Sequence, residues 1–257
     1  MALIQLKELI PPLFFRVIKY LEKKIIRIKG GIVRTPPFDA IPKDVNVKWI
    51  LDVGANVGDV AVSALKSFPG AQVICLEPVN KTYDILKKRL HPYSERSHLF
   101  NVALSDVEGT GLINITTFHG ANSIETQAQF HRDFNPHVRE VSKEEITLVR
   151  LDDFAFKFPS QKIDIMKIDV EGHELNVLKG GANFISNNVD VIIIEIALMR
   201  DQTLKNQAVF EIFSFFNDIG FCLLNVMDLH HVENETMQLV QMDCVFRNMK
   251  NINIVNQ

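Results

Sequence analysis

The chain has few cysteines, and they are scattered. Its 257 residues include only Cys75, Cys222 and Cys244, each inside an apolar stretch and none in a C-x-x-C pair. An odd number of isolated cysteines excludes a complete disulfide framework, and the usual ligand spacing of a zinc site is missing. We therefore expect reduced, buried thiols in a cytoplasmic protein.

Long apolar runs and a strong net charge are also missing. No segment reaches the roughly 20 apolar residues that cross a bilayer, and the N-terminus has neither a basic leader nor a small-residue cleavage site. The formal net charge is −3, whereas broad nucleic-acid binding needs a basic field that neutralises phosphates. We therefore expect no nucleic-acid partner, and the 47% hydrophobic content suits one α/β domain with a short extension.

Residues 1–34 form a separate compositional zone, which we predict to be a basic amphipathic helix. Apolar residues recur there at helical spacing, lysines and arginines dominate the polar side, and the Gly30-Gly31 pair ends the pattern. Such a helix can dock on the domain, form a homodimer contact or lie on an anionic membrane surface as a peripheral contact, and the sequence leaves these alternatives open. A linker that contains three prolines, residues 35–46, follows.

From residue 47 to residue 250 the hydrophobic pattern alternates between strands and helices, and we assign this part to one domain, with 251–257 as a tail. The expected strands are 49–53, 71–76, 99–104, 163–168, 189–196, 221–226 and 239–246, with extended pieces at 111–117 and 147–151. The expected helices are 59–67, 81–90, 174–180 and 208–219. The alternation predicts a mostly parallel sheet, and the last two strands, joined without a helix, predict one antiparallel strand.

The most informative segment runs from residue 49 to residue 59, Trp-Ile-Leu-Asp-Val-Gly-Ala-Asn-Val-Gly-Asp. Gly54 and Gly58 let the backbone approach a ligand, and the helix start that follows offers free N–H groups. The order is not G-x-G-x-x-G, and Asp52 before the turn would repel a pyrophosphate but attract a cationic ligand. This favours S-adenosylmethionine over NAD, with Asn56 in the binding turn. The alternative is an ordinary turn in which Asn56 or Asp59 caps the helix.

Two more acids follow neighbouring strands of the expected sheet. Glu77 ends the second strand, where a carboxylate can accept both hydroxyls of a ribose. Asp106 follows the third strand, where it can accept a hydrogen bond from an adenine amino group. The alternative for Glu77 is a solvated acid before a turn proline.

The string from Met166 to Glu174, Met-Lys-Ile-Asp-Val-Glu-Gly-His-Glu, follows a central strand and is rich in ionisable residues. His173 suits a general base near neutral pH, and Asp169 or Glu171 would orient it. The alternative is a structural network that caps the next helix. Several carboxylates can also hold Mg²⁺, but no D-x-D-like spacing occurs, so we predict no metal ligand here.

Two further features point to the same edge of the sheet. Glu195 ends the apolar strand 189–196 and belongs beside the acids of the central strand. The segment 118–145 has poor periodicity and is rich in polar and aromatic residues, so it is either a lid or wall for the acceptor substrate or a solvated loop.

These motifs together resemble the FkbM family of S-adenosylmethionine-dependent methyltransferases. The resemblance rests on Asp-Val-Gly-Ala-Asn-Val-Gly at 52–58, Glu-Pro at 77–78, Asn-Val-Ala-Leu-Ser-Asp at 101–106, Leu-Asp-Asp at 151–153 and Asp-Ile-Met-Lys-Ile-Asp-Val-Glu-Gly-His-Glu at 164–174. It spans roughly residues 47 to 246. Family membership implies a class I methyltransferase fold, which is a Rossmann-like α/β fold with a seven-stranded sheet, its last strand antiparallel, and helices on both faces.

The resemblance also implies a reaction. It implies O-methylation of a hydroxyl group on a sugar, a glycan or a secondary metabolite, with S-adenosylmethionine as donor and S-adenosylhomocysteine as product. By position, the turn residues Asp52, Gly54, Asn56 and Gly58 would hold the methionine part, Glu77 the ribose and Asp106 the adenine. The catalytic roles of Asp169, Glu171 and His173 rest on the residues alone.

Two other function classes compete with this interpretation. A nicotinamide-dependent oxidoreductase is disfavoured by the turn spacing and by the lack of a Tyr-x-x-x-Lys pair. A non-catalytic, membrane-associated binding module is supported only by the basic segment 1–34. Methylation of planar nitrogens is disfavoured as well, because the chain lacks an Asn/Asp-Pro-Pro-Tyr string after the central strand.

Overall fold

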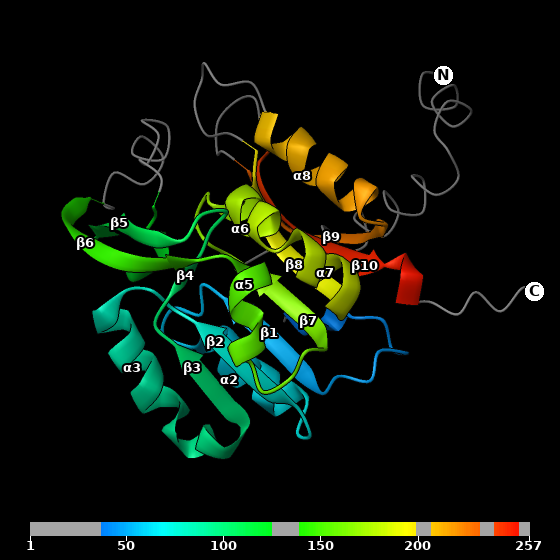
Figure 1. Cartoon of the computed structure of the whole chain (residues 1–257), viewed down its shortest axis with the longest axis horizontal. Helices are drawn as coiled ribbons and strands as arrows, with labels where there is room; N and C mark the ends of the chain where they lie inside the picture. The colour runs from blue at the N-terminus through cyan, green and yellow to red at the C-terminus, as the bar shows by residue number, and fades with distance from the viewer. Residues whose placement is uncertain (1–36, 125–138, 199–206, 232–238, 252–257) are drawn as a thin grey trace, which may run out of the picture. The chain divides into compact units, whose positions relative to one another are not determined.

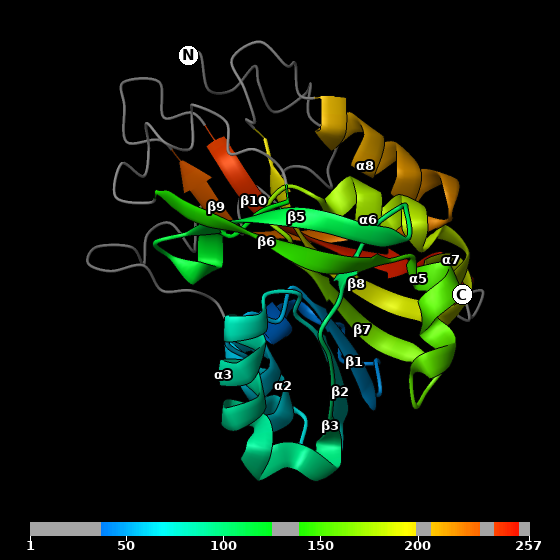
Figure 2. The same ribbon diagram turned by 60° about the vertical axis from the view of Figure 1, so that its left-hand side comes forward.

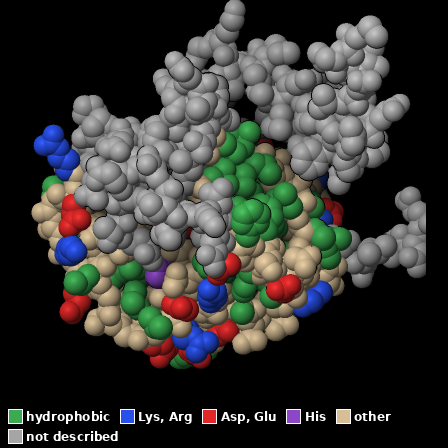
Figure 3. All heavy atoms as spheres, turned by 90° about the horizontal axis from the view of Figure 1, so that it is seen from above, with side chains coloured by type: hydrophobic (Ala, Val, Ile, Leu, Met, Phe, Trp, Pro, Cys, Tyr) green, Lys and Arg blue, Asp and Glu red, His purple; other side chains and the backbone are tan. Residues whose placement is uncertain are grey.

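A computed structural model describes residues 37–124, 139–198, 207–231 and 239–251 (Figure 1). The expected N-terminal helix, 1–34, lies outside these residues, as does most of the expected tail, so the predicted domain limits stay predictions. Among the described residues, no helix is long and apolar enough to cross a membrane. Figure 3 shows the face of the molecule that carries helix α8, Gln207–Asp218, where hydrophobic side chains gather. Phe210 on this helix is 72% exposed.

The core of the fold is a seven-stranded sheet in the order β3-β2-β1-β7-β8-β10-β9. Its strands are β1 Trp49–Val53, β2 Gln72–Leu76, β3 Ser97–Phe100, β7 Ile163–Ile168, β8 Val189–Ala197, β9 Phe221–His231 and β10 Leu239–Asn248. The first five pair in parallel, whereas β10 lies antiparallel to both β8 and β9. This confirms the predicted sheet of seven strands with the last one antiparallel.

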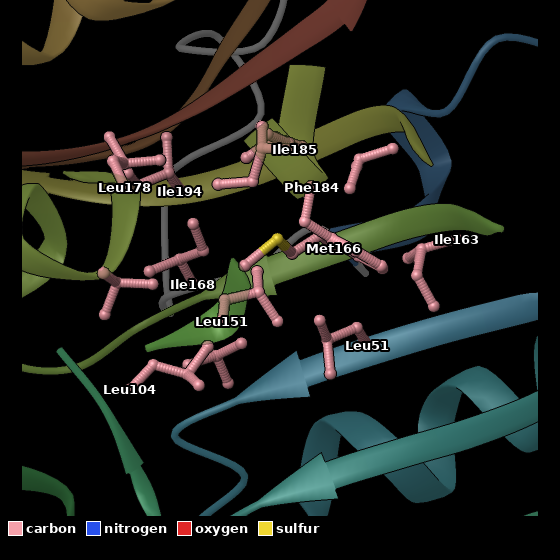
Figure 4. Close-up of a cluster of buried hydrophobic side chains, with 14 of the residues drawn as sticks. Leu51, Leu104, Leu151, Ile163, Met166, Ile168, Leu178, Phe184, Ile185 and Ile194 are labelled. Carbon is pink, nitrogen blue, oxygen red and sulfur yellow. The ribbon is translucent and has the colours of Figure 1, made fainter. Parts of the chain in front are cut away.

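Helices cover both faces of this sheet, as predicted. They are α2 Asp59–Ser67, α3 Asn80–Leu90, α5 Leu151–Phe154, α6 Glu174–Gly180, α7 Ala182–Asn188 and α8 Gln207–Asp218, with 3₁₀ turns at Pro37–Ala40, His91–Arg96, His119–Ala121, Ala155–Lys157 and Met249–Asn251. Successive strand residues alternate between faces. Leu51 therefore belongs to the core cluster that also contains residues of α6 and α7 (Figure 4), whereas Ile50 belongs to the cluster that contains residues of α2 and α3.

A second sheet of three strands was not predicted. Its strands β4 Ala103–Leu104, β5 Gly109–Thr116 and β6 Glu140–Val149 are arranged in the order β4-β6-β5 (Figure 2). The expected single strand 99–104 is wrong, because the chain leaves the large sheet at Asn101, whose side-chain amide donates to the carbonyls of Glu77 and Pro78 at 2.9 Å each. Part of the expected lid or loop, 140–145, is strand, and 125–138 lies outside the described residues.

One cysteine prediction is also wrong. Cys75 and Cys244 are buried and unpaired, as expected, but Cys222 is exposed. It lies on β9, which is the edge strand of the large sheet, so it has a neighbouring strand on one side only. The apolar sequence around Cys222 therefore indicates a strand, but it does not indicate that the Cys222 side chain is buried.

The described part of the expected linker lies against the domain. Phe38 packs edge-to-face on Phe68, with ring centroids 5.5 Å apart. Asp44 accepts two hydrogen bonds, at 3.0 and 2.7 Å, from the guanidinium of Arg247 on β10. The charged pair joins the start of the domain to its last strand.

Candidate functional site

The turn after β1 packs between the end of β2 and the residues that follow β7. The backbone N–H groups of Gly54 and Ala55 both donate to the carbonyl of Leu76, at 3.0 and 2.9 Å. Gly54 has φ of +79°, and a Cβ atom there would lie 2.0 Å from the carbonyl oxygen of Asp169. Glycine is therefore required by conformation and by space. The turn continues through Asn56 at φ of +51° to Gly58, which caps α2 without a side-chain hydrogen bond.

Glu77 joins the end of β2 to this turn. Its Oε2 accepts a hydrogen bond from the N–H of Asn56 at 2.9 Å, and its Oε1 accepts one from Val79 at 3.0 Å. The side chain is buried, and burial raises the pKa of its carboxyl to about 7 despite these two bonds. Each oxygen keeps a further lone pair, so the carboxylate can also accept hydroxyl donors.

Asp52 lies behind the turn. Its side chain is completely buried, and neither carboxylate oxygen has a hydrogen-bond partner among the described residues. The nearest strand partner on β7 is Lys167. Burial raises the pKa of Asp52 to about 6, although the charge of Lys167 opposes this. The predicted contact of Asp52 with the amino group of a ligand stays a prediction.

Three carboxylates meet at the ends of β7 and β8. Oxygen atoms of Asp169, Glu171 and Glu195 lie within 4.8 Å of one another. We call these three residues the carboxylate group. Lys167, itself buried, contributes the neighbouring positive charge, with its Nζ 2.6 Å from Oδ2 of Asp169.

The raised pKa values of Glu171 and Glu195 follow from burial and crowding. Burial, together with the charges of Asp169 and Glu174, raises the pKa of Glu171 to about 8. Burial also raises the pKa of Glu195 well above its usual value, and Asp169 and Glu171 add to this. Carboxylates that are close together and desolvated either share protons or bind a cation. The prediction that no metal binds here stays a prediction.

His173 and Asp106 are linked through the hydroxyl of Ser105 near the start of α6. The ring Nε2 of His173 lies 3.0 Å from the hydroxyl oxygen of Ser105, and the His173 side chain is buried. The Ser105 hydroxyl lies 3.2 Å from Oδ1 of Asp106, which also accepts a hydrogen bond from the Asn176 side chain at 3.0 Å. The bond from Asn176 is the main reason that the pKa of Asp106 falls below its usual value.

The structure thus divides the predicted site residues into three places. Glu77 and the turn residues gather at the ends of β1 and β2, and Asp169 and Glu171 lie beside them at the end of β7. The described contacts of Asp106 and of the His173 ring are with Ser105 and α6, so their assignments to adenine and to proton transfer stay predictions. Sequence reasoning missed Ser105 and also Ser123, which donates to the carbonyl of Glu171. Ser105 lies within the motif 101–106 and Ser123 within the segment 118–145, but no local pattern shows which group a serine hydroxyl will contact.

The sequence motifs at these positions correspond to a known domain. A sequence model of the methyltransferase FkbM domain matches residues 52–223. The match begins at Asp52 and includes Glu77, the carboxylate group and the start of β9. It therefore covers both the turn between β1 and α2 and the carboxylate group at the ends of β7 and β8.

Individual relatives are distant. The methyltransferase sdnD of Sordaria araneosa is 28% identical over 154 residues, which is 51% of this chain and 60% of that protein. The 2-O-methyltransferase NoeI of Sinorhizobium fredii is 31% identical over 144 residues, 51% of this chain and 56% of that protein. The chain therefore aligns with less than two thirds of either relative's length. The crystal structure of methyltransferase FkbM from Methylobacillus flagellatus KT shares the fold at 15% identity, with a TM-score of 0.50 over 83% of this chain and 48% of that one.

Proposed function

This chain belongs to the methyltransferase FkbM domain family, and we propose on that premise that it transfers the methyl group of S-adenosylmethionine to a hydroxyl group of a sugar, a glycan or another small natural product. The family match over residues 52–223 carries the proposal. A 2-O-methyltransferase among the relatives supports a hydroxyl acceptor. The nicotinamide oxidoreductase considered from the sequence is not supported by this family.

The residues at the ends of β1 and β2 fit a nucleoside with a cationic side chain. Gly54 and Gly58 leave the turn without Cβ atoms, and a Cβ at Gly58 would lie 2.7 Å from a methyl carbon of Leu86. Glu77 has lone pairs for two ribose hydroxyls, while its bonds to Asn56 and Val79 hold it in place. When bound, S-adenosylmethionine supplies an electrophilic methyl group on a sulfonium.

The carboxylate group offers a base for the proton that the acceptor hydroxyl loses during methyl transfer. An acceptor hydroxyl loses its proton as its oxygen attacks, and a positioned base typically accelerates such a step about 10²–10⁴-fold. Ionised Glu171 or Asp169 can take this proton on a carboxylate oxygen. The pKa of Glu171, about 8, is well matched to a base that works near neutral or slightly alkaline pH. His173, whose ring lies against the Ser105 hydroxyl, would then help to hold the start of α6 in place.

The cofactor assignment is tested by calorimetric titration of the purified full chain with S-adenosylhomocysteine. We expect micromolar binding, about tenfold or more weaker in Glu77→Ala because the ribose loses its acceptor. Gly70→Ala is the matched control, since a Cβ at Gly70 meets no atom within 4 Å. The absence of binding in folded wild-type protein would contradict the proposal.

The acceptor class is tested separately. Incubation with S-adenosylmethionine and a panel of sugars, oligosaccharides and hydroxylated natural products should give a product in which one hydroxyl hydrogen is replaced by methyl. Mass spectrometry and NMR would locate the methyl group. Methylation of amines alone would rule out the hydroxyl acceptor while leaving methyl transfer intact.

A further inference from the structure

Ser123 lies at the point where the second sheet meets the carboxylate group. It follows β5 and the 3₁₀ turn His119–Ala121, and its side chain is buried. Asn114 on β5 holds its backbone. The N–H of Asn114 donates to the carbonyl of Ser123 at 2.8 Å, the N–H of Ser123 donates back at 3.3 Å, and the Asn114 side-chain amide adds a bond at 3.1 Å.

The hydroxyl of Ser123 takes no part in these bonds with Asn114 and contacts a different segment. It donates to the backbone carbonyl of Glu171 at 2.6 Å, across 48 residues of sequence. The bond therefore joins the β4-β6-β5 sheet directly to the turn that follows β7. A second contact of the β4-β6-β5 sheet is with helix α3: the N–H of Asn80, the first residue of α3, donates to the carboxylate of Glu144 on β6 at 2.8 Å.

The turn that receives this bond has an unfavourable backbone. Glu171 has φ of +50° and Gly172 has φ of +105°. A non-glycine residue in the left-handed region is strained and persists only when its surroundings hold it there. Two bonds do so: the Ser123 hydroxyl on the Glu171 carbonyl, and Oε1 of Glu174, which accepts the Gly172 N–H at 2.8 Å.

Electrostatics also opposes the observed position of Glu171. Its carboxylate is brought among those of Asp169 and Glu195, where like charges repel and the positive charge of Lys167 offsets this only in part. A turn free to relax would release Glu171 toward solvent. The bonds that hold the turn therefore also hold the carboxylate group together.

We infer that Ser123 is a positioning residue: its hydroxyl fixes the turn at Glu171, so that the second sheet sets where the Glu171 carboxylate meets the acceptor hydroxyl. The kinetic part of this inference rests on the proposed function. The conformational part does not, since it concerns only the backbone of residues 170–173.

The test compares Ser123→Ala with Ser97→Ala in the full chain. Ser97 is a matched control because its hydroxyl also donates to a backbone carbonyl, that of Tyr93 at 3.0 Å, but at the start of β3. We expect Ser123→Ala to lower kcat about tenfold or more, with the affinity for S-adenosylhomocysteine changed less than about twofold. Ser97→Ala should change neither quantity.

Hydrogen exchange gives a readout that does not depend on activity. The amide of Gly172 should exchange about tenfold or more faster in Ser123→Ala than in wild type, while the amide of Gly54 on β1's turn keeps its rate. Equal exchange at Gly172 in the two proteins, or an equal loss of kcat in Ser97→Ala, would overturn the inference. Faster exchange at Gly172 in a protein whose wild type transfers no methyl group would uphold the positioning role and refute the proposed function instead.

Discussion

Glu77 is the residue whose ionisation most directly affects the proposed ligand. Burial raises the pKa of its carboxyl to about 7, even though two backbone N–H groups donate to it. An ionised carboxylate accepts hydroxyl donors about twice as strongly as a neutral group does. A proton on Glu77 also takes up one of the oxygens. Ligand affinity should therefore follow the charge of this one side chain.

We expect the affinity for S-adenosylhomocysteine to rise as the pH rises through about 7 and then to level off. Below this pH Glu77 is protonated in the free protein, so binding must first remove that proton, whereas above it the carboxylate is ready. The expected gain between pH 5.5 and pH 8 is about tenfold. Glu77→Gln should flatten the profile, and Asp84→Asn, on the exposed side of α3, should leave it unchanged. Calorimetry at both pH values measures this, and a wild-type profile that is already flat would contradict it.

At the scale of elements, the turn between β1 and α2 is built into the sheet. Its N–H groups donate to the carbonyl of Leu76 at the end of β2, and Gly54 packs against the backbone of Asp169, the residue that follows β7. The turn is therefore rigid on both sides, which favours a ligand site that is already formed. Its glycines carry this arrangement, because a side chain at Gly54 would strike backbone rather than a flexible side chain.

Gly54→Ala should lower the free energy of unfolding by about 2 kcal/mol or more, from the left-handed φ and the 2.0 Å overlap with the Asp169 carbonyl. The same change at Gly70, where a Cβ has open space, should change it by less than about 1 kcal/mol. Denaturant unfolding measures both. If the two variants were equally stable, the close packing of the turn against β7 would be wrong.

At the scale of the whole molecule, the order of the sheet assembles the site. Residues 52, 77, 169 and 195 are far apart in sequence, but β2, β1, β7 and β8 are consecutive neighbours and run in parallel. Their carboxyl ends therefore lie along one edge, where ligands of open α/β sheets bind. The second sheet is joined to this edge through Ser123 and Glu144.

A ligand bound across several strands should stabilise the domain as a unit. At a concentration of S-adenosylhomocysteine about 100 times its Kd, the free energy of unfolding should rise by about 2.7 kcal/mol. Glu77→Ala, if it binds about tenfold more weakly, should keep only about 1.4 kcal/mol of this gain at the same concentration, and Ser123→Ala should keep all of it. Thermal unfolding followed by circular dichroism measures the shift, and stabilisation of Glu77→Ala equal to wild type would contradict the role of Glu77.

Local pattern was sufficient to predict much of the fold. The strand 163–168 and the helix 59–67 were predicted within their observed limits, because continuous apolar runs and glycine turns act within one segment. The strand 99–104 was predicted wrongly because its two halves pair with different sheets. Periodicity cannot show which partner a strand takes.

The sequence by itself determined the succession of strands and helices, the glycine turn after β1 and the acids at the strand ends. These features depend on residues that are neighbours along the chain. Only the tertiary structure decided that Asp52 is buried, that His173 faces Ser105 and that Ser123 donates to the carbonyl of Glu171. Each of these contacts joins distant segments, and each exists because side chains from different elements must fill the same space and satisfy one another's hydrogen bonds.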